Sequence, residues 1–254
     1  GQSIDLGEGD NSLIVRLGET FGASVPAGRI EELDFAANDP AIEGVDTLEI
    51  DGDLFFGGFK TLSTDGIEPS EIIFSGRQIA LNPIRGVTIQ DFNGDKIRFE
   101  EELTTAGTGP DAGKTFYVNT PDAEDDLSID FEQGVVSVIA AQGVTDLTIN
   151  GGDGDINIDW VDTQKDGLQA ESLEKLTLNL GDDNLKITQS NTVNLTTLIA
   201  SGEGNVTLDG VAFAPSGAMI TLGSGDDIVV GGEGDDILDG GAGSDILNGG
   251  DGTD

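Results

Sequence analysis

The sequence lacks cysteine and histidine altogether. No disulfide can hold the fold, and a zinc site of the Cys/His type is excluded. The most common general base of enzymes is absent as well. The lack of cysteine does not fix the compartment, but it is compatible with an extracellular protein that calcium stabilises in place of disulfides.

Basic residues are scarce too. The 254 residues contain 11 lysines and arginines against 49 aspartates and glutamates, which gives a formal net charge of -38. Such a surface repels nucleic acids and anionic bilayers, so we expect no nucleic-acid partner and no direct docking on an anionic membrane. The charge is explained either by a well-solvated surface or by divalent cations that neutralise part of it.

Long hydrophobic runs are missing. The most apolar window, residues 134–141, has the length of a β-strand. A membrane helix needs about 18 or more apolar residues, so we expect no membrane insertion. The first ten residues contain no lysine or arginine, and no signal peptide is visible there.

A nine-residue phrase recurs at the C-terminal end. From Leu222 the sequence reads LGSGDDIVV, GGEGDDILD, GGAGSDILN and GGDGTD, following the pattern G-G-x-G-x-D-x-U-x with U a large aliphatic residue. The fourth copy stops after its sixth residue, so we expect the sequence to be a piece of a longer protein. The sixth position is aspartate in every copy: Asp227, Asp236, Asp245 and Asp254.

Each position of the phrase has a physical role. Glycine at the first, second and fourth positions lets the backbone turn sharply and leaves main-chain carbonyls able to face an ion. The carboxylate at the sixth position is a hard oxygen donor of the kind that calcium prefers. The seventh and eighth positions make a short aliphatic strand, and Val229, Leu238 and Leu247 can stack into a core.

The phrase resembles the calcium-binding repeats of the RTX family. The resemblance implies an all-β, right-handed parallel β-helix or β-roll, in which each nonapeptide forms one turn and one strand. It also implies that Asp227 shares an ion with Asp245, and Asp236 with Asp254, while carbonyls of residues 223–225, 232–234, 241–243 and 250–252 complete each shell. The glycines among these are Gly223, Gly225, Gly232, Gly234, Gly241, Gly243, Gly250 and Gly252. Asp226 and Asp235, at the variable fifth position, are not counted as ligands.

Two alternatives compete with a calcium-loaded roll. One is a flexible linker rich in glycine and aspartate, but a linker has no reason to keep an aliphatic pair every nine residues. The other is a roll that folds without metal, but its stacked carboxylates would repel each other. We therefore expect several calcium ions as the cofactor.

Similar apolar pairs recur upstream, separated by turns rich in glycine, aspartate and asparagine. Pairs eight or nine residues apart are 147–150 with 156–159, 176–180 with 185–188, and 198–201 with 206–209. This spacing predicts one solenoid from about residue 126, with degenerate turns. Insertions at 158–176 and 211–219 are expected to form corner loops, with a single helical turn at 169–176. Asn11, Asp155 and Asp183 are weaker metal candidates.

The N-terminal half is less regular. Residues 101–125 are rich in glycine, proline, threonine and aspartate, and we interpret them as a long connection with a domain boundary near residue 120. The predicted division is a β-rich domain over 1–120, for which a degenerate solenoid is one interpretation, then a degenerate parallel β-solenoid over 121–221 and intact but truncated repeats over 222–254.

Outside the nonapeptides, residues 172–183 and 194–210 resemble RTX-type bacterial S-layer and large surface adhesin proteins, which type I systems export. The resemblance implies a non-catalytic, secreted, calcium-dependent structural protein on the surface of a Gram-negative-type bacterium, with partners such as copies of itself or a cell-surface polysaccharide. The alternative is an accessory module of a type I-secreted enzyme or toxin, and a carbohydrate-binding module is a third reading. Serine, threonine and lysine show no arrangement typical of an activated nucleophile, so we expect no enzyme.

Overall fold

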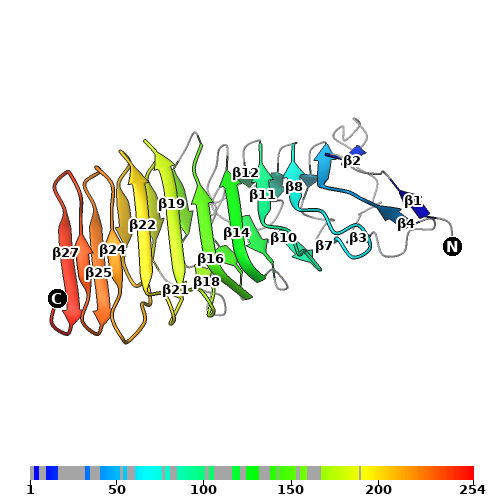
Figure 1. Cartoon of the computed structure of the whole chain (residues 1–254). Helices are drawn as coiled ribbons and strands as arrows, with labels where there is room; N and C mark the ends of the chain where they lie inside the picture. The colour runs from blue at the N-terminus through cyan, green and yellow to red at the C-terminus, as the bar shows by residue number, and fades with distance from the viewer. Residues whose placement is uncertain are drawn as a thin grey trace.

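The fold consists of short strands that wind into a long solenoid. The computed structural model describes residues 3–5, 10–16, 32–34, 41–51, 54–55, 61–75, 78–80, 85–100, 103–105, 116–120, 124–131, 138–141, 143–152, 155–158, 167–188 and 190–254. These residues form 27 strands and no helix, and every strand pairing among them is parallel. The coils advance along one axis from β1 at one end to β27 at the other (Figure 1).

The strands belong to five sheets. The long sheet contains β2 (Ser12–Arg16), β5 (Thr47–Asp51), β8 (Glu71–Phe74), β11 (Lys96–Phe99), β14 (Glu124–Phe131), β16 (Gly143–Asn150), β19 (Lys175–Gly181), β22 (Thr197–Gly202), β24 (Met219–Thr221) and β26 (Ile237–Asp239). The side sheet contains β3 (Glu32–Asp34), β7 (Thr61–Ser63), β10 (Arg85–Gln90), β13 (Phe116–Asn119), β15 (Val138–Ala140), β18 (Leu168–Gln169) and β21 (Ser190–Asn191). The terminal sheet contains β17 (Ile156–Ile158), β20 (Leu185–Ile187), β23 (Val206–Leu208), β25 (Ile228–Glu233) and β27 (Ile246–Asp251). Two small sheets contain β6 (Leu54–Phe55), β9 (Gln78–Ala80) and β12 (Leu103–Thr105), and β1 (Ser3–Asp5) with β4 (Ala41–Glu43).

The coil changes shape along the chain. From β16 to β22 the chain visits the long, terminal and side sheets in turn, so each coil has three sides. After β22 it alternates between the long and terminal sheets only, so the coils become two-sided. The first two-sided coil still has 22 residues, between Thr197 and Met219, and the next has 18 residues, between Met219 and Ile237. Two nonapeptides without an insertion account for the shorter coil.

Inward-facing aliphatic side chains form continuous columns through the coils. Leu147, Leu176, Leu198 and Ile220 occupy matching register positions in the long sheet, and all four are fully or almost fully buried. Buried and more exposed residues alternate along β19 and along residues 146–150 of β16, and this alternation produces the columns, because successive side chains of a strand point to opposite faces.

Aromatic rings form a separate column in the coils of β8, β11 and β14. Phe99 stacks on Phe74 with ring centroids 4.9 Å apart and on Phe131 at 5.5 Å. These three residues share one register position of the long sheet, so the offset-stacked pairs follow directly from the coil repeat.

The predicted all-β parallel solenoid is confirmed, and the apolar pairs between residues 147 and 209 form β16, β17, β19, β20, β22 and β23. Two expectations are wrong in detail. The segment 101–125 is not a plain connection, because it contains β12, β13 and the start of β14. Residues 169–176 form no helical turn; they leave β18 through a turn and enter β19.

The long sheet runs without interruption past both predicted domain boundaries. β11 pairs with β14 across residue 120, and β24 pairs with β26 across residue 221. The division into three domains stays a prediction. None of the described residues belongs to a helix long and apolar enough to cross a membrane.

Candidate metal centre

The four sixth-position aspartates lie on two edges of the solenoid. We call the turns 222–227 and 240–245, which lead from the long sheet to the terminal sheet, the first edge. Residues 231–236, which end β25 and lead back to the long sheet, and the corresponding residues 249–254 at the end of β27 form the second edge. Figure 1 shows these turns stacked at the β25–β27 end.

Neighbouring coils bring the aspartates together in pairs. On the first edge, the amide N–H of Asp227 donates to Oδ1 of Asp245 at 3.1 Å. On the second edge, the N–H of Asp236 donates to Oδ1 of Asp254 at 2.9 Å. The structure thus brings together the two pairs that the RTX resemblance implies. Their role as metal ligands stays a prediction.

The two oxygens of each inner aspartate have different surroundings. Oδ1 of Asp227 accepts a 2.7 Å hydrogen bond from the N–H of Val206, and Oδ1 of Asp236 accepts one of 2.7 Å from Ala218. The Oδ2 atoms of both aspartates are buried and have no hydrogen-bond partner. Asp227 is 0% exposed and Asp236 is 3% exposed. A buried, unpaired carboxylate oxygen is costly, so these positions favour a cation.

The electrostatics of Asp227 agree with this assignment. Burial raises the pKa of the Asp227 carboxyl above its ordinary value of 3.8, and the hydrogen bond from Val206 opposes that rise. The nearby carboxylates of Asp245 and Asp226 raise the pKa further. A bound cation would offset both the desolvation and the repulsion between carboxylates.

Glycine at the first position makes room for the aspartate of the same turn. A Cβ on Gly231 would lie 2.5 Å from Oδ2 of Asp236. A Cβ on Gly240 would collide with the carboxylate of Asp245, and one on Gly249 with that of Asp254. The side chain therefore folds back over its own turn. The first copy has Leu222 at this position, which is buried in the core.

The second and fourth glycines bring carbonyl oxygens against the next coil. A Cβ on Gly241, whose φ is 79°, would collide with the carbonyl oxygen of Gly223, and one on Gly243 with that of Gly225. Gly250 and Gly252 stand in the same relation to the carbonyls of Gly232 and Gly234. Carboxylate and carbonyl oxygens thus stack on each edge, in the close approach that only glycine permits.

These donors suit calcium. Ca²⁺ takes about six to eight oxygen ligands in flexible geometry, from carboxylates and backbone carbonyls. Among the described residues, no three acidic side chains gather into a metal-binding group, so backbone carbonyls must contribute. On the first edge, the residues that would hold an ion are Asp227 and Asp245 with Gly223, Gly225, Gly241 and Gly243. On the second edge they are Asp236 and Asp254 with Gly232, Gly234, Gly250 and Gly252.

The weaker candidates lie elsewhere in the turns. Asp155 occupies the fifth position, because its neighbour Ile156 is in register with Leu185 and Val206. Asp183 is buried at 8% exposure and stands two residues before Leu185, in the column of the fourth position. Asn11 lies on the opposite edge, where its N–H donates to Oδ2 of Asp46 at 2.8 Å. A ligand role for these three residues stays a prediction.

The fifth position has a role that the sequence did not reveal. Oδ1 of Asp226 accepts a 2.8 Å hydrogen bond from the N–H of Ser244. Oδ1 of Asp235 likewise accepts one of 2.9 Å from Thr253. Each carboxylate thus joins its turn to the corresponding turn of the next coil. The recurrence of aspartate or asparagine just before the sixth position was the available signal.

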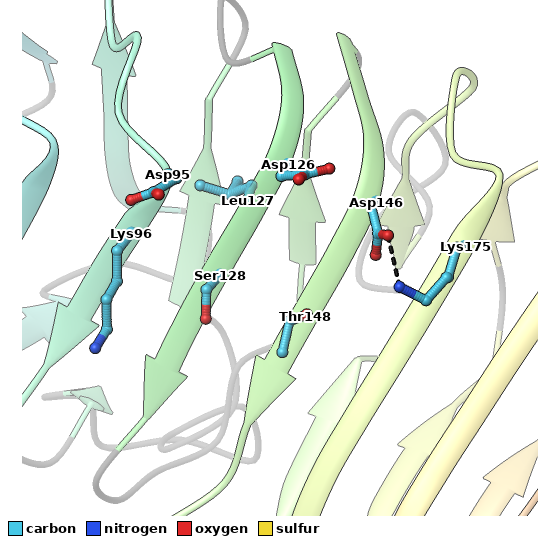
Figure 2. A pocket seen from close by; sticks show the side chains of 8 residues that line it. All are labelled: Asp95, Lys96, Asp126, Leu127, Ser128, Asp146, Thr148 and Lys175. Atoms are coloured by element: carbon cyan, nitrogen blue, oxygen red, sulfur yellow. Dashed lines mark hydrogen bonds and ion pairs between the residues drawn. The ribbon is translucent and has the colours of Figure 1, made fainter.

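A shallow groove of about 360 Å³, lined mainly by polar and charged residues, crosses the outer face of the long sheet over β11, β14, β16 and β19 (Figure 2). Lys175 Nζ lies 2.6 Å from Asp146 Oδ2 at one end. Lys96 Nζ lies 3.2 Å from Asp130 Oδ2 at the other end. Ser128 and Thr148 point into the space between. The remaining lining residues are Asp95, Asp126 and Leu127. Such a surface can exchange hydrogen bonds with a hydroxyl-rich ligand.

Comparison with protein-family models matches residues 221–254 to the RTX calcium-binding nonapeptide repeat, in four copies. No curated protein and no solved structure matches the chain. Residues 221–254 are therefore RTX calcium-binding nonapeptide repeats.

Proposed function

We propose that the protein is a non-catalytic, calcium-dependent structural protein of the bacterial cell surface, of the S-layer or adhesin type. The observation that carries the proposal is the pair of buried Oδ2 atoms of Asp227 and Asp236, which have no hydrogen-bond partner and belong to turns that stack glycine carbonyls. A solenoid that continues from β2 to β27 supports the structural role, because stacked coils make a long and regular body.

The calcium requirement fits export from a Gram-negative-type cell through a type I system. Extracellular calcium modules bind with dissociation constants of about 10⁻⁴–10⁻³ M, far above the calcium level inside cells. With calcium at ten times the dissociation constant, one site adds about 1.4 kcal/mol to folded-state stability. The repeats would therefore stay unfolded inside the cell and fold outside it.

Assembly of the purified chain tests the surface role. Electron microscopy after calcium addition is expected to show ordered arrays or filaments that EGTA disperses. The matched control is the double variant Asp227→Asn, Asp236→Asn, which keeps the size of both side chains and removes the charges. Folding on calcium without any assembly would contradict the S-layer or adhesin role and leave calcium binding in place.

An accessory module of a type I-secreted enzyme or toxin is the second candidate. The match of residues 221–254 to RTX repeats supports it, because such repeats would serve the export and folding of a protein whose chemistry is located elsewhere. Hydrolase, lyase or lytic activity of the complete protein, lost when calcium is chelated, would support this candidate over the first.

A cell-surface polysaccharide is the ligand class that the groove over β11 to β19 supports. Its hydroxyl and amino groups, with carboxylates at the rim, can hydrogen-bond sugar hydroxyls across several strands. Binding on a glycan array, weakened by Thr148→Val but not by Thr207→Val on the terminal sheet, would support this ligand. Equal binding by both variants would exclude the groove as the polysaccharide-binding site.

A further inference from the structure

The upstream coils replace the sixth-position aspartate with apolar side chains. On the first edge, the register of the terminal sheet places Val206, Leu185 and Ile156 in the column that Asp227 and Asp245 occupy downstream. Their exposed fractions are 2%, 1% and 1%, so all three join the core. The column that buries charge in the RTX coils is hydrophobic in the coils before them.

The second edge shows the same change. The register of the long sheet places Ala218 and Thr196 in the column of Asp236. Ala218 is buried, and Thr196 is exposed and donates to the carbonyl of Glu174 at 3.2 Å. Neither residue brings a buried charge to this edge.

Hydrogen bonds between side chain and backbone join the upstream turns instead. Oδ1 of Asp155 accepts from the N–H of Asn184 at 3.1 Å. Oδ1 of Asn184 accepts from Asn205 at 2.8 Å, and Oδ1 of Asn205 from Asp226 at 2.7 Å. We call Asp155, Asn184, Asn205 and Asp226 the fifth-position ladder. Two of its members are neutral amides, and every link satisfies a backbone donor without a metal.

Polar groups on the third side of the upstream coils are satisfied as well. Thr192 is fully buried, and its hydroxyl donates to the carbonyl of Ala212 at 2.6 Å. The hydroxyl of Ser190 lies 2.7 Å from that of Thr192 and accepts from the N–H of Ala212 at 2.8 Å. These bonds fix the segment that leads into the first RTX coil.

The balance of acidic and basic residues also differs between the RTX coils and the coils upstream of them. Residues 222–254 contain nine acidic residues and no basic residue. Upstream, on the long sheet, Lys175 pairs with Asp146, and Lys96 pairs with Glu71 and Asp130. Within the RTX coils, no basic side chain is present to relieve the repulsion between carboxylates.

We propose that the coils from β16 to β23 fold without calcium and act as a preformed template on which the RTX coils order when calcium binds. This inference rests on the calcium dependence of the repeats in the proposed function. The template offers the parallel edges of β22 and β23 to β24 and β25. It also offers Oδ1 of Asn205 to the N–H of Asp226, and the N–H of Val206 to Oδ1 of Asp227.

Hydrogen–deuterium exchange of the intact chain, with calcium and with EGTA, tests the template. In EGTA, we expect the backbone amides of β24 to β27 to lose their protection from exchange, and those of β16, β19, β20 and β22 to keep it. Loss of protection in all of these strands at once would overturn the template while leaving calcium dependence intact. Protection of β24 to β27 in EGTA would instead show that the repeats need no calcium, so the two failures are distinguishable.

A pair of variants tests the ladder itself. Asn205→Ala removes the acceptor for Asp226, whereas Asn205→Asp keeps an oxygen at that place. One net hydrogen bond corresponds to a roughly two- to tenfold change in an equilibrium constant. We therefore expect protection of β24 and β25 at a fixed, limiting calcium concentration to fall by that factor in Asn205→Ala and to be kept in Asn205→Asp. Equal protection in Asn205→Ala and the unaltered chain would overturn the role of the ladder.

Discussion

Val206 and Asp227 meet where the apolar upstream coils end and the RTX coils begin. The amide N–H of Val206 donates a 2.7 Å hydrogen bond to Oδ1 of Asp227, one coil later. Oδ2 of the same carboxylate is buried and has no hydrogen-bond partner. One oxygen thus continues the solenoid, and the other is left for a cation. Because the two oxygens have different roles, each substitution of the aspartate has a specific expected outcome.

Removal of calcium is expected to lower the β-sheet signal in circular dichroism, and added calcium should restore it. Magnesium should restore it poorly, because Mg²⁺ dehydrates reluctantly and demands near-ideal octahedral geometry. Each occupied site should stabilise the fold by about 1.4 kcal/mol when calcium is ten times its dissociation constant. A melting temperature that does not change with calcium would contradict the metal assignment.

Asp227→Asn is expected to have opposite effects with and without calcium. An asparagine keeps an oxygen for the N–H of Val206 but loses the charge, so calcium affinity should fall. In calcium-free buffer, the variant should resist urea better than the unaltered chain, because it buries no uncompensated charge. Asp226→Asn is the matched control, since Asp226 is exposed and its hydrogen bond to Ser244 needs only an oxygen. Lower stability of Asp227→Asn in both conditions would contradict the assignment.

The stability of the calcium-free RTX coils is expected to fall as pH rises. Burial raises the pKa of Asp227 above 3.8 in the folded state. A raised folded-state pKa contributes stability that is fully present below the unfolded value and is lost as pH rises through the folded value. In calcium-free buffer, the urea midpoints of the unaltered chain and of Asp227→Asn should therefore coincide in acid. They should diverge as the pH rises above the folded-state pKa of Asp227. A constant difference across this range would show that Asp227 does not titrate in this way.

Sequence periodicity predicted the parts of the fold that repeat. Alternation over residues 147–150 and 176–180 identified β16 and β19, because a half-buried strand requires that pattern. The resemblance to RTX repeats implied that Asp227 and Asp245 lie next to each other, and the register of β25 and β27 places them so. Both results follow from geometry that every coil shares.

The parts that sequence reasoning missed are short or depend on neighbouring coils. β18 and β21 contain two residues each, too few to show alternation, so the third side of the upstream coil was not visible. The role of the fifth position also escaped notice. Asn205 and Asp226 accept hydrogen bonds from backbone amides 21 and 18 residues away. The recurrence of aspartate or asparagine at the fifth position does not by itself reveal these contacts between coils.

Two adjacent glycines provide the sharpest test of the turn geometry. Gly231→Ala is expected to destabilise the second edge, because its Cβ would collide with the carbonyl oxygen of Gly249 and with Oδ2 of Asp236. Gly232→Ala is the matched control, since its Cβ would meet only Phe213 Cβ at 3.9 Å, an ordinary contact. We expect a loss of about 1–3 kcal/mol for Gly231→Ala, and less than about 0.5 kcal/mol for Gly232→Ala.

Calcium-dependent urea unfolding of both glycine variants measures this difference. Because the collision involves the carboxylate itself, Gly231→Ala should also raise the calcium concentration needed for folding, whereas Gly232→Ala should not. Equal calcium requirements for the two variants would mean that the Asp236 side chain does not fold back over its own turn when the ion is bound.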